Sequence, residues 1–455
     1  MPAERPRSIQ RRIDFQPDFL SARIGSWSEP ALLEGGPGLG EAGRWSILAA
    51  RPRQTFESLD GSALERLATT VRDLGLARSD TRPDHAAAPF QGGLIGYFGY
   101  DLAPRIERLP RRNRTDSRLP SLRFGLYDTF VVVDHVRKTA TLHAVDFLDE
   151  GPQRLEERCE RWRTDLDQPL EPRPESVLSP VLAELGRDDY RRAIARTLEY
   201  INAGDIYQAN LSHRFRATGK VDPLGLYLKL KTISPAPFAG FLAWDDLAIL
   251  SASPELFYRT EADRIITRPI KGTRPRSSDA ITDTRLAAEL TASTKDRAEL
   301  TMIVDLERND LGKVCRFGTV QVTEPWRVES FEQVHHLVAT IEGRLRPEFG
   351  PIDIVRALFP GGSITGAPKI RAMQIIDELE PNCRSVYTGA IGYFSLGGLS
   401  AFNIAIRTML VEGDQVSYQV GGGIVADSDP ELEYVETLDK GRGMSQALEA
   451  FRSEQ

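Results

Sequence analysis

Short apolar runs separated by glycine- and proline-containing turns recur along almost the whole chain, and this pattern constrains the fold more than any other feature. Up to about residue 147, runs such as Gly93–Phe98 and Thr129–Asp134 have the length and composition of β-strands. After a charged, proline-containing segment with one expected helix over Gln153–Thr164, strand-like runs return, now mixed with helical spacing. Hairpin-connected strands interspersed with helices are typical of α+β proteins. We therefore expect an α+β fold with a large antiparallel or mixed sheet.

The change of pattern near residue 150 predicts three regions: an N-terminal region over 1–150, a linker over 151–185 and a C-terminal region over 186–455. In the C-terminal region we expect helices at Asp188–Ala203, Asp283–Leu290, Lys295–Leu306, Ile352–Leu358 and Pro368–Leu379. Strands are expected at Phe238–Trp244, Ala248–Ser251, Arg264–Thr267, Gly318–Val322, Val386–Phe394, Ala401–Val411 and Gln415–Val420.

Charge and cysteine content exclude several classes of protein. The 455 residues carry a net charge of −7, with nine lysines, 49 arginines and no run of five basic residues, so nucleic acid and anionic membrane partners are not expected. The charge-free stretch Ser385–Ile406 contains four glycines and several polar residues, and we interpret it as two strands joined at Gly397-Gly398 rather than a membrane span. Three cysteines predict neither a disulfide framework nor a zinc site and favour a reduced cytoplasmic compartment.

A C-terminal segment combines three glycines with a charged helix. Ser428 and Glu431 have capping-box spacing, and the helix that they begin would present Glu433, Glu436 and Lys440 on one face, beside Gly421–Gly423. Two carboxylates on such a face could form half of a Mg²⁺ site. A solvated helix with an ordinary ion pair is equally compatible with the spacing.

Three further segments could carry chemistry. Lys271 lies among several arginines, where a cationic field and burial would lower its pKa toward that of a neutral nucleophile. Glu255 follows an apolar strand, where a carboxyl tends to have a raised pKa and can donate a proton. The glycine-rich loop Phe359–Lys369 opens a helix whose N–H groups could bind an anion. A basic surface loop, a turn acid and a capped turn are the alternative interpretations.

Taken together and in order, these segments resemble the chorismate-utilising enzymes, the family of anthranilate synthase component I, aminodeoxychorismate synthase component I, isochorismate synthase and salicylate synthase. The resemblance covers the chain after about the first dozen residues. It implies the fold of that family, with large sheets packed as a sandwich and helices on the outside. It is carried by Pro89–Asp101, Gly204–Leu211, Asp305–Asp310, His336–Val338, Gly361–Lys369 and Gly421–Lys440.

Two positions separate the reactions within this family. Members that add water to chorismate carry a lysine where this chain has Gln208, and a neutral amide cannot be that base. Members that form aminodeoxychorismate carry a nucleophilic lysine where anthranilate synthases typically carry alanine, and here that residue is Lys271. The resemblance thus implies amination of chorismate through a covalent lysine adduct, toward para-aminobenzoate and folate, with anthranilate formation as the alternative. Glu255 would be the general acid and later the base.

The same resemblance implies the remaining site residues and Mg²⁺ as the cofactor. Glu299 and Glu436 would bind the metal directly, and Glu433 through water. The substrate pocket would be lined by Gly272, Thr273, His336, Ser363, Tyr387, Arg407, Gly421, Gly422, Gly423 and Lys440.

Two further features follow from the comparison with the family. Some members bind tryptophan in an N-terminal pocket, here matched by Gly35, Arg44, Trp45, Pro237 and Phe238, but Gly35 replaces the serine that contacts this ligand. No cysteine lies in a glutaminase nucleophile context, so ammonia is expected from a separate glutaminase subunit in a heterodimer. The last step to 4-aminobenzoate would belong to another protein.

Overall fold

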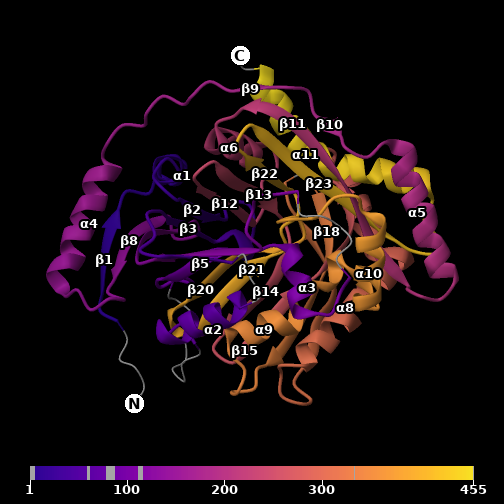
Figure 1. The fold of residues 1–455 in the computed structure, drawn as a ribbon, viewed down its shortest axis with the longest axis horizontal. Helices are drawn as coiled ribbons and strands as arrows, with labels where there is room; N and C mark the ends of the chain where they lie inside the picture. The colour runs from indigo at the N-terminus through magenta and orange to yellow at the C-terminus, as the bar shows by residue number, and fades with distance from the viewer. Residues whose placement is uncertain (1–5, 59–61, 78–87, 111–115, 333, 454–455) are drawn as a thin grey trace.

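The computed structural model describes residues 6–58, 62–77, 88–110, 116–332 and 334–453, which form four layers: helices, a sheet, a second sheet and more helices (Figure 1). The strand pairs in these ranges are all antiparallel, and each sheet takes strands from both 1–150 and 186–455. The expected α+β sandwich with outer helices is therefore confirmed.

The first sheet has thirteen strands, and at its centre strands of the N-terminal region pair with strands of the C-terminal region. β2 pairs with both β3 and β12, so a segment near residue 33 lies between segments near residues 47 and 240. In spatial order the strands are β1 (Ser8–Ile13), β8 (Thr139–Val145), β7 (Thr129–Asp134), β3 (Trp45–Ala49), β2 (Ala31–Glu34), β12 (Phe238–Trp244), β13 (Leu247–Ser253), β22 (Thr408–Glu412), β23 (Gln415–Ile424), β11 (Gln208–Lys220) and β10 (Leu182–Ala183), with β9 (Val177–Leu178) and β19 (Gly366–Ala367) also paired to β11.

The second sheet has ten strands and the same mixed origin. In spatial order they are β16 (Ile270–Pro275), β18 (Val334–Arg344), β15 (Arg264–Arg268), β14 (Leu256–Glu261), β21 (Leu399–Asn403), β20 (Ala390–Ser395), β5 (Gly93–Phe98), β6 (Leu122–Tyr127) and β4 (Thr55–Ser58), with β17 (Gln321–Ser330) also paired to β18.

Helices cover the outer face of each sheet, which explains why many strands are apolar on both sides. In β5, Ile95 and Tyr97 belong to the core between the sheets, whereas Leu94 and Phe98 pack toward the helices. The first sheet packs against α1 (Pro17–Gly25), α4 (Pro152–Leu166), α5 (Arg187–Asn202), α6 (Pro223–Ile233), α10 (Lys369–Leu379) and α11 (Pro430–Ser453). The second packs against α2 (Ala63–Asp73), α3 (Ala103–Ile106), α7 (Ala280–Ala292), α8 (Thr294–Gly312) and α9 (Pro351–Leu358).

Three expected strands differ from those observed. The run Ala401–Val411 is two strands, β21 in the second sheet and β22 in the first, because the chain crosses between the sheets at residues 404–407. The strand expected at Gly318–Val322 begins only at Gln321, after a turn in which Gly318 has a φ of 76°. The strand expected from Val386 begins at Ala390, after a turn in which Thr388 has a φ of 58°.

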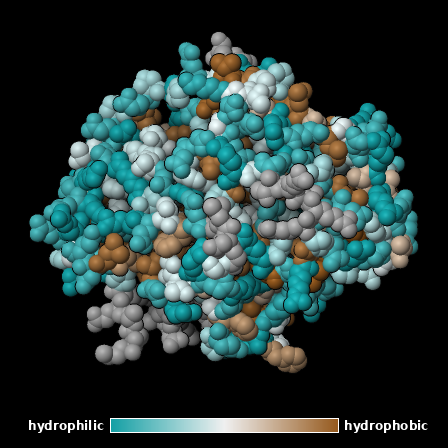
Figure 2. All heavy atoms as spheres, viewed as in Figure 1, coloured by the Kyte–Doolittle hydropathy of each residue, from teal (hydrophilic) through white to brown (hydrophobic). Residues whose placement is uncertain are grey.

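The other expected elements are present within a few residues of their predicted bounds, and the two strands joined at Gly397-Gly398 are β20 and β21. No helix in the described ranges has the length and apolar character that crossing a membrane requires. The face shown in Figure 2 is mainly hydrophilic, with small separate hydrophobic areas.

Candidate active site

Bare glycine backbone forms one wall of the candidate site. Gly421–Gly423 lie in β23 opposite Asn210, Leu211 and Ser212 of β11. A Cβ atom on Gly423 would lie 3.0 Å from Gln208 Nε2 and 3.1 Å from Lys271 Nζ. One on Gly422 would lie 3.1 Å from a Glu433 carboxylate oxygen and 3.8 Å from Lys440 Nζ. The glycines thus leave space toward Glu433 and Lys440 beside Gly422, and toward Gln208 and Lys271 beside Gly423.

Lys271 enters this space from β16, in the second sheet. Among the described residues its Nζ has no hydrogen-bond or ion-pair partner, and burial is the main reason why its pKa is lowered. The charge of Lys440 lowers it further, while Glu299 opposes the shift. The following residue, Gly272, has a φ of 78°, and a Cβ there would approach Asp296 to 2.8 Å. Glycine is therefore required beside the amine.

Glu255 lies where the chain leaves β13 in one sheet and enters β14 in the other. Its side chain is buried, and the Ile270 N–H donates to its Oε1 at 3.4 Å. Burial raises the pKa of Glu255 to about 7, although Ser363 and Lys271 both favour the carboxylate. Ser363 itself is buried with its hydroxyl otherwise unpartnered among the described residues.

A second crossover lies beside the first and carries Arg407. The Ile404 N–H donates to the carbonyl of Glu255 at 3.0 Å, which ties the two crossovers together. Arg407 has a φ of 50°, and its guanidinium forms no hydrogen bond or ion pair within the described ranges. Burial lowers its pKa. A half-buried cation without a counter-ion is unfavourable, so this position is suited to an anionic ligand.

His336 adds a neutral donor or acceptor near the guanidinium. Its Nδ1 lies 2.9 Å from the Thr273 hydroxyl, and its buried Nε2 has no partner in the described part of the chain. Burial and the charge of Arg407 lower the pKa of His336 to about 3, so the ring is neutral at pH 7. The predicted site residue Tyr387 is buried beside Asn210, and burial raises its pKa to about 12.

The predicted metal ligands face the same region without forming a closed cluster. Glu433 and Glu436 lie one turn apart on α11, and both Glu299 and Glu436 act electrostatically on Lys271. Lys440 Nζ forms an ion pair with Glu436 at 2.8 Å and donates to the carbonyl of Gly421 at 3.1 Å. Over the residues described, no three acidic, histidine or cysteine side chains form a preassembled metal site.

The predicted capping box at the start of α11 is wrong. The carboxylate of Asp429, rather than the Ser428 hydroxyl, accepts from the N–H groups of Glu431 and Leu432 at 2.9 and 3.0 Å. Ser428 instead donates to Glu433 at 2.6 Å. The serine therefore orients a carboxylate of the candidate site, while burial raises the pKa of Glu433.

The loop Phe359–Lys369 is held by its own lysine rather than presented as an open anion site. Lys369 Nζ donates to the carbonyls of Leu358 and Pro360 at 3.0 and 2.7 Å and pairs with buried Asp310. This lysine is a structural anchor that places Ser363 beside Glu255.

Glu307 is a buried carboxyl on α8 for which the sequence predicted no individual role. Together with Leu300, Ile303, Val304 and Leu311 it lies on the buried face of that helix. The sequence signal for a special role of Glu307 is that a carboxyl stands at a helical position whose neighbours on the same face are apolar.

Comparisons with known proteins decide the family. Residues 30–446 match the family model described as chorismate binding enzyme. The chain belongs to the chorismate-binding enzyme family. Aminodeoxychorismate synthase component 1 of Escherichia coli (strain K12) is 41% identical over 95% of this chain and 96% of its own length. Anthranilate synthase component 1 of Thermus thermophilus is 39% identical over 90% of each. The crystal structure of anthranilate synthase component I from Streptococcus pneumoniae has a TM-score of 0.78 at 32% identity, covering 88% of this chain and 92% of that one.

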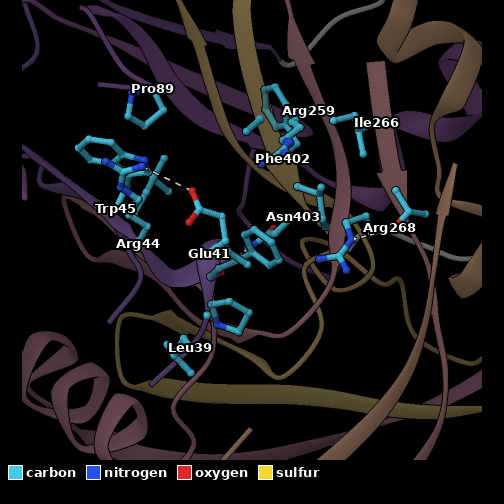
Figure 3. Close-up of a pocket in the computed structure, with 18 of the residues that line it drawn as sticks. Leu39, Glu41, Arg44, Trp45, Pro89, Arg259, Ile266, Arg268, Phe402 and Asn403 are labelled. Carbon is cyan, nitrogen blue, oxygen red and sulfur yellow. Dashed lines mark hydrogen bonds and ion pairs between the residues drawn. The ribbon is translucent and has the colours of Figure 1, made fainter. Parts of the chain in front are cut away.

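This chorismate-binding enzyme also has a cavity of about 990 Å³ between the two sheets (Figure 3), and Lys271 is not one of the residues that line it. Arg44 and Trp45 lie on one side of it, and Arg259 and Phe402 on the other. Of the five predicted tryptophan-pocket residues, Arg44, Trp45, Pro237 and Phe238 line the cavity, whereas Gly35 does not.

Gly35 packs directly against the backbone of Gly43. A Cβ at position 35 would lie 2.2 Å from the carbonyl oxygen of Gly43, so a serine side chain would not fit this loop conformation. The Gly36 N–H also donates to that oxygen, at 2.8 Å.

Proposed function

We propose that this enzyme replaces the C4 hydroxyl of chorismate by an amino group and forms 4-amino-4-deoxychorismate. The observation that carries the proposal is the position of Lys271, whose unpaired amine faces the glycine wall beside the neutral amide of Gln208. Relatives named aminodeoxychorismate synthase component 1 in Escherichia coli and Bacillus subtilis, at 41% and 36% identity, support it.

In the first displacement, Lys271 acts as the neutral amine and Glu255 acts as the protonated acid. The neutral amine of Lys271 attacks C2 of the conjugated diene, and the electron pair moves toward C4. The C4–O bond breaks, and Glu255 supplies the proton with which the hydroxyl leaves as water. The pKa of about 7 at Glu255 keeps a large fraction of it protonated near neutrality.

The second displacement restores both residues. Ammonia attacks C4, the C2–N bond to Lys271 breaks, and the electron pair returns through the ring. Glu255 takes the proton that the new C4 ammonium loses, and Lys271 leaves as the amine. The two displacements place nitrogen on the carbon that lost the hydroxyl, and the enolpyruvyl group stays intact.

Substrate carboxylates are bound at the cationic positions. Arg407 is half-buried and its guanidinium has no counter-ion among the described residues, and the neutral His336 offers Nε2 beside it. Lys440 stands at the other side of the glycine wall. Together with Gly272, Thr273, Ser363, Tyr387 and Gly421–Gly423, these groups suit a small dicarboxylate.

The carboxylates of Glu299, Glu433 and Glu436 fit a Mg²⁺ ion. Mg²⁺ usually takes one or two carboxylates and keeps several waters, so an open arrangement of three carboxylates around one space is compatible with it. Glu299 and Glu436 would hold the ion directly and Glu433 through water. When bound, Mg²⁺ would neutralise the substrate C1 carboxylate.

Ammonia would come from a glutaminase subunit that forms a heterodimer with this chain. Several relatives are named as component 1 of a synthase, which supports a second component. All three cysteines are buried. Cytoplasmic localisation and a place before 4-aminobenzoate formation belong to the same proposal.

Anthranilate formation is the second candidate function, because anthranilate synthases are also about 40% identical. The test is to incubate the purified chain with chorismate, Mg²⁺ and an ammonium salt and to identify the product by chromatography and mass. We expect 4-amino-4-deoxychorismate without pyruvate. Anthranilate together with pyruvate would reject the proposal.

The covalent role of Lys271 is tested separately with Lys271→Ala. We expect at least a 100-fold loss of kcat, while Lys138→Ala, on an exposed turn of the first sheet, keeps the wild-type rate. An unchanged rate in Lys271→Ala would remove the nucleophile from the mechanism.

A further inference from the structure

A buried carboxyl behind Glu255 takes no part in the reaction described above. Glu307 lies on α8 with 9% of its surface exposed, and it faces β15 and the loop that carries Ser363. A Cβ on Gly362 would lie 3.5 Å from Glu307 Cγ, which places this side chain directly under the loop.

The hydrogen bonds of Thr267 determine the protonation state of Glu307. Thr267 Oγ1 lies 2.7 Å from the carbonyl oxygen of Phe257 and 2.6 Å from Glu307 Oε2. A threonine hydroxyl has one proton, and a backbone carbonyl can only accept. If the proton of Thr267 goes to Phe257, the contact with Glu307 needs a proton on Oε2.

A β-bulge commits that proton to Phe257. The register of β14 shifts between Leu256 and Arg259 on one side and between Leu256 and Tyr258 on the other, so Phe257 is opposite no residue in either ladder. A buried carbonyl needs a donor, and the ladder is locally disrupted at a bulge. The Thr267 hydroxyl is that donor.

We infer that Glu307 is a protonated carboxylic acid that donates to Thr267 and acts as a positioning residue for Glu255. The chain of bonds runs from Glu307 through Thr267 to the carbonyl of Phe257, two residues after Glu255. It holds the bulge from which the general acid enters the site. The inference rests on the proposed function only for the role of Glu255.

The charges around Glu307 agree with this assignment. Burial raises its pKa to about 8, against the hydrogen bond with Thr267, which lowers it. The carboxylates of Glu255 and Asp310 raise it as well, whereas Lys369 lowers it. The amine of Lys369 is already paired with Asp310, so it does not neutralise Glu307. As the two carboxyls interact, Glu255 and Glu307 titrate as a coupled pair.

The first experiment needs no substrate. Infrared spectra at pH 7 of the full chain and of Glu307→Gln are subtracted to reveal the C=O stretch of a protonated carboxylic acid. We expect one such band to disappear in Glu307→Gln, whose amide still donates to Thr267. Asp305→Asn, an exposed position on the same helix, should leave the band unchanged. A difference spectrum without a protonated-carboxyl band would overturn the inference, because the band of protonated Glu255 is common to both proteins and cancels.

The second experiment tests the positioning role. At pH 7 with a fixed concentration of free ammonia, we expect Glu307→Gln to keep kcat within about twofold. Glu307→Met, which fills the space without a donor, should lose at least tenfold in kcat with little change in KM for chorismate. Equal losses of kcat in the two variants would show that the hydrogen bond donated by residue 307 does not position Glu255.

The alkaline side of the pH profile gives the third readout. Two coupled carboxyls should give a slope of log kcat against pH that approaches −2 in the wild type, and removing one ionisation should reduce it to −1 in Glu307→Gln. Coincident profiles would reject the coupling to Glu255. If the product assay yields anthranilate while the infrared band behaves as expected, the proposed function fails and the protonation of Glu307 stands.

Discussion

At the residue scale, the site shifts the pKa of an amine downward and the pKa of a carboxyl upward, each toward the protonation state that the proposed reaction needs. Burial lowers the pKa of Lys271 and raises that of Glu255 to about 7. Lys271 acts when deprotonated, so activity rises with pH on the acid side. Glu255 acts when protonated, so activity falls as pH rises through about 7 and beyond. The profile of kcat/KM should therefore be bell-shaped.

Replacing Glu255 by Gln tests which limb belongs to it. We expect Glu255→Gln to lose 10²–10⁴-fold in kcat, as an order-of-magnitude estimate for general acid catalysis, and to lose the limb near pH 7. Rate measurements from pH 5.5 to 9.5, at constant free ammonia, provide the check. The variant should keep only the limb of Glu307, with a slope of −1, and an alkaline limb as steep as that of the wild type would assign the limb near pH 7 to a group other than Glu255.

The half-buried guanidinium of Arg407 carries a second residue-scale prediction, in which binding and stability change in opposite directions. Arg407→Met removes a partly desolvated charge that has no counter-ion among the described residues, so the free enzyme should become more stable in chemical denaturation. The same change removes a charge-assisted contact worth about 1.5–3 kcal/mol, so KM for chorismate should rise about 10- to 150-fold. Arg442→Met, at an exposed position of α11, should change neither quantity. A destabilised Arg407→Met with unchanged KM would indicate a structural arginine.

Single residues were predictable where chemistry alone decides their role. Glu255, at the end of an apolar strand, was expected to have a raised pKa. The capping box predicted at Ser428 is wrong because the spacing from Glu431 fits a cap equally well. Only the side-chain hydrogen bond to Glu433 shows that the serine orients a carboxylate. Glu307 lay inside a recognised motif, but its partners Thr267 and Phe257 are distant in sequence.

At the element scale, the two crossovers between sheets bring the acid and the arginine together. The apolar run Ala401–Val411 shows strand composition throughout, so its periodicity contains no sign that residues 404–407 leave one sheet for the other. Strand composition reflects burial on both faces, which is the same in the two sheets. Local sequence therefore predicts the strands of this protein well and their sheet membership poorly.

The glycine wall in β23 permits an element-scale prediction with two matched variants. A Cβ on Gly421 would meet the carbonyl oxygen of Leu211 at 2.5 Å, which is fixed backbone. We expect Gly421→Ala to destabilise the fold by about 1–3 kcal/mol. A Cβ on Gly423 would meet only the ends of the Gln208 and Lys271 side chains. Gly423→Ala should keep its stability and lose at least tenfold in kcat.

Urea unfolding and steady-state kinetics of the two glycine variants separate these effects. If Gly423→Ala unfolds as readily as Gly421→Ala, the wall is a packing feature. If both variants keep full activity, the open space beside Gly423 is not where substrate binds.

At the scale of the whole molecule, the two halves of the chain share both sheets, and this connectivity predicts how the protein responds to being divided. β2 lies between β3 and β12 in the first sheet, and β5 pairs with β20 in the second. The core between the sheets likewise joins residues such as Ile47 and Ile95 to Leu242 and Ile391. Residues 186–455 contain every proposed catalytic residue and yet lack these partners.

We therefore expect residues 186–455, expressed alone, to lack a cooperative unfolding transition, because β12 and β20 would expose strand edges and the core between the sheets would lose one wall. Co-expression with residues 1–185 should restore a soluble complex that turns over chorismate. Circular dichroism during thermal unfolding, together with the product assay, distinguishes the outcomes. A cooperative transition in the isolated fragment would show that the shared strands are dispensable for folding. The contribution of the N-terminal region would then be to form one wall of the cavity beside Trp45 rather than to stabilise the sheets.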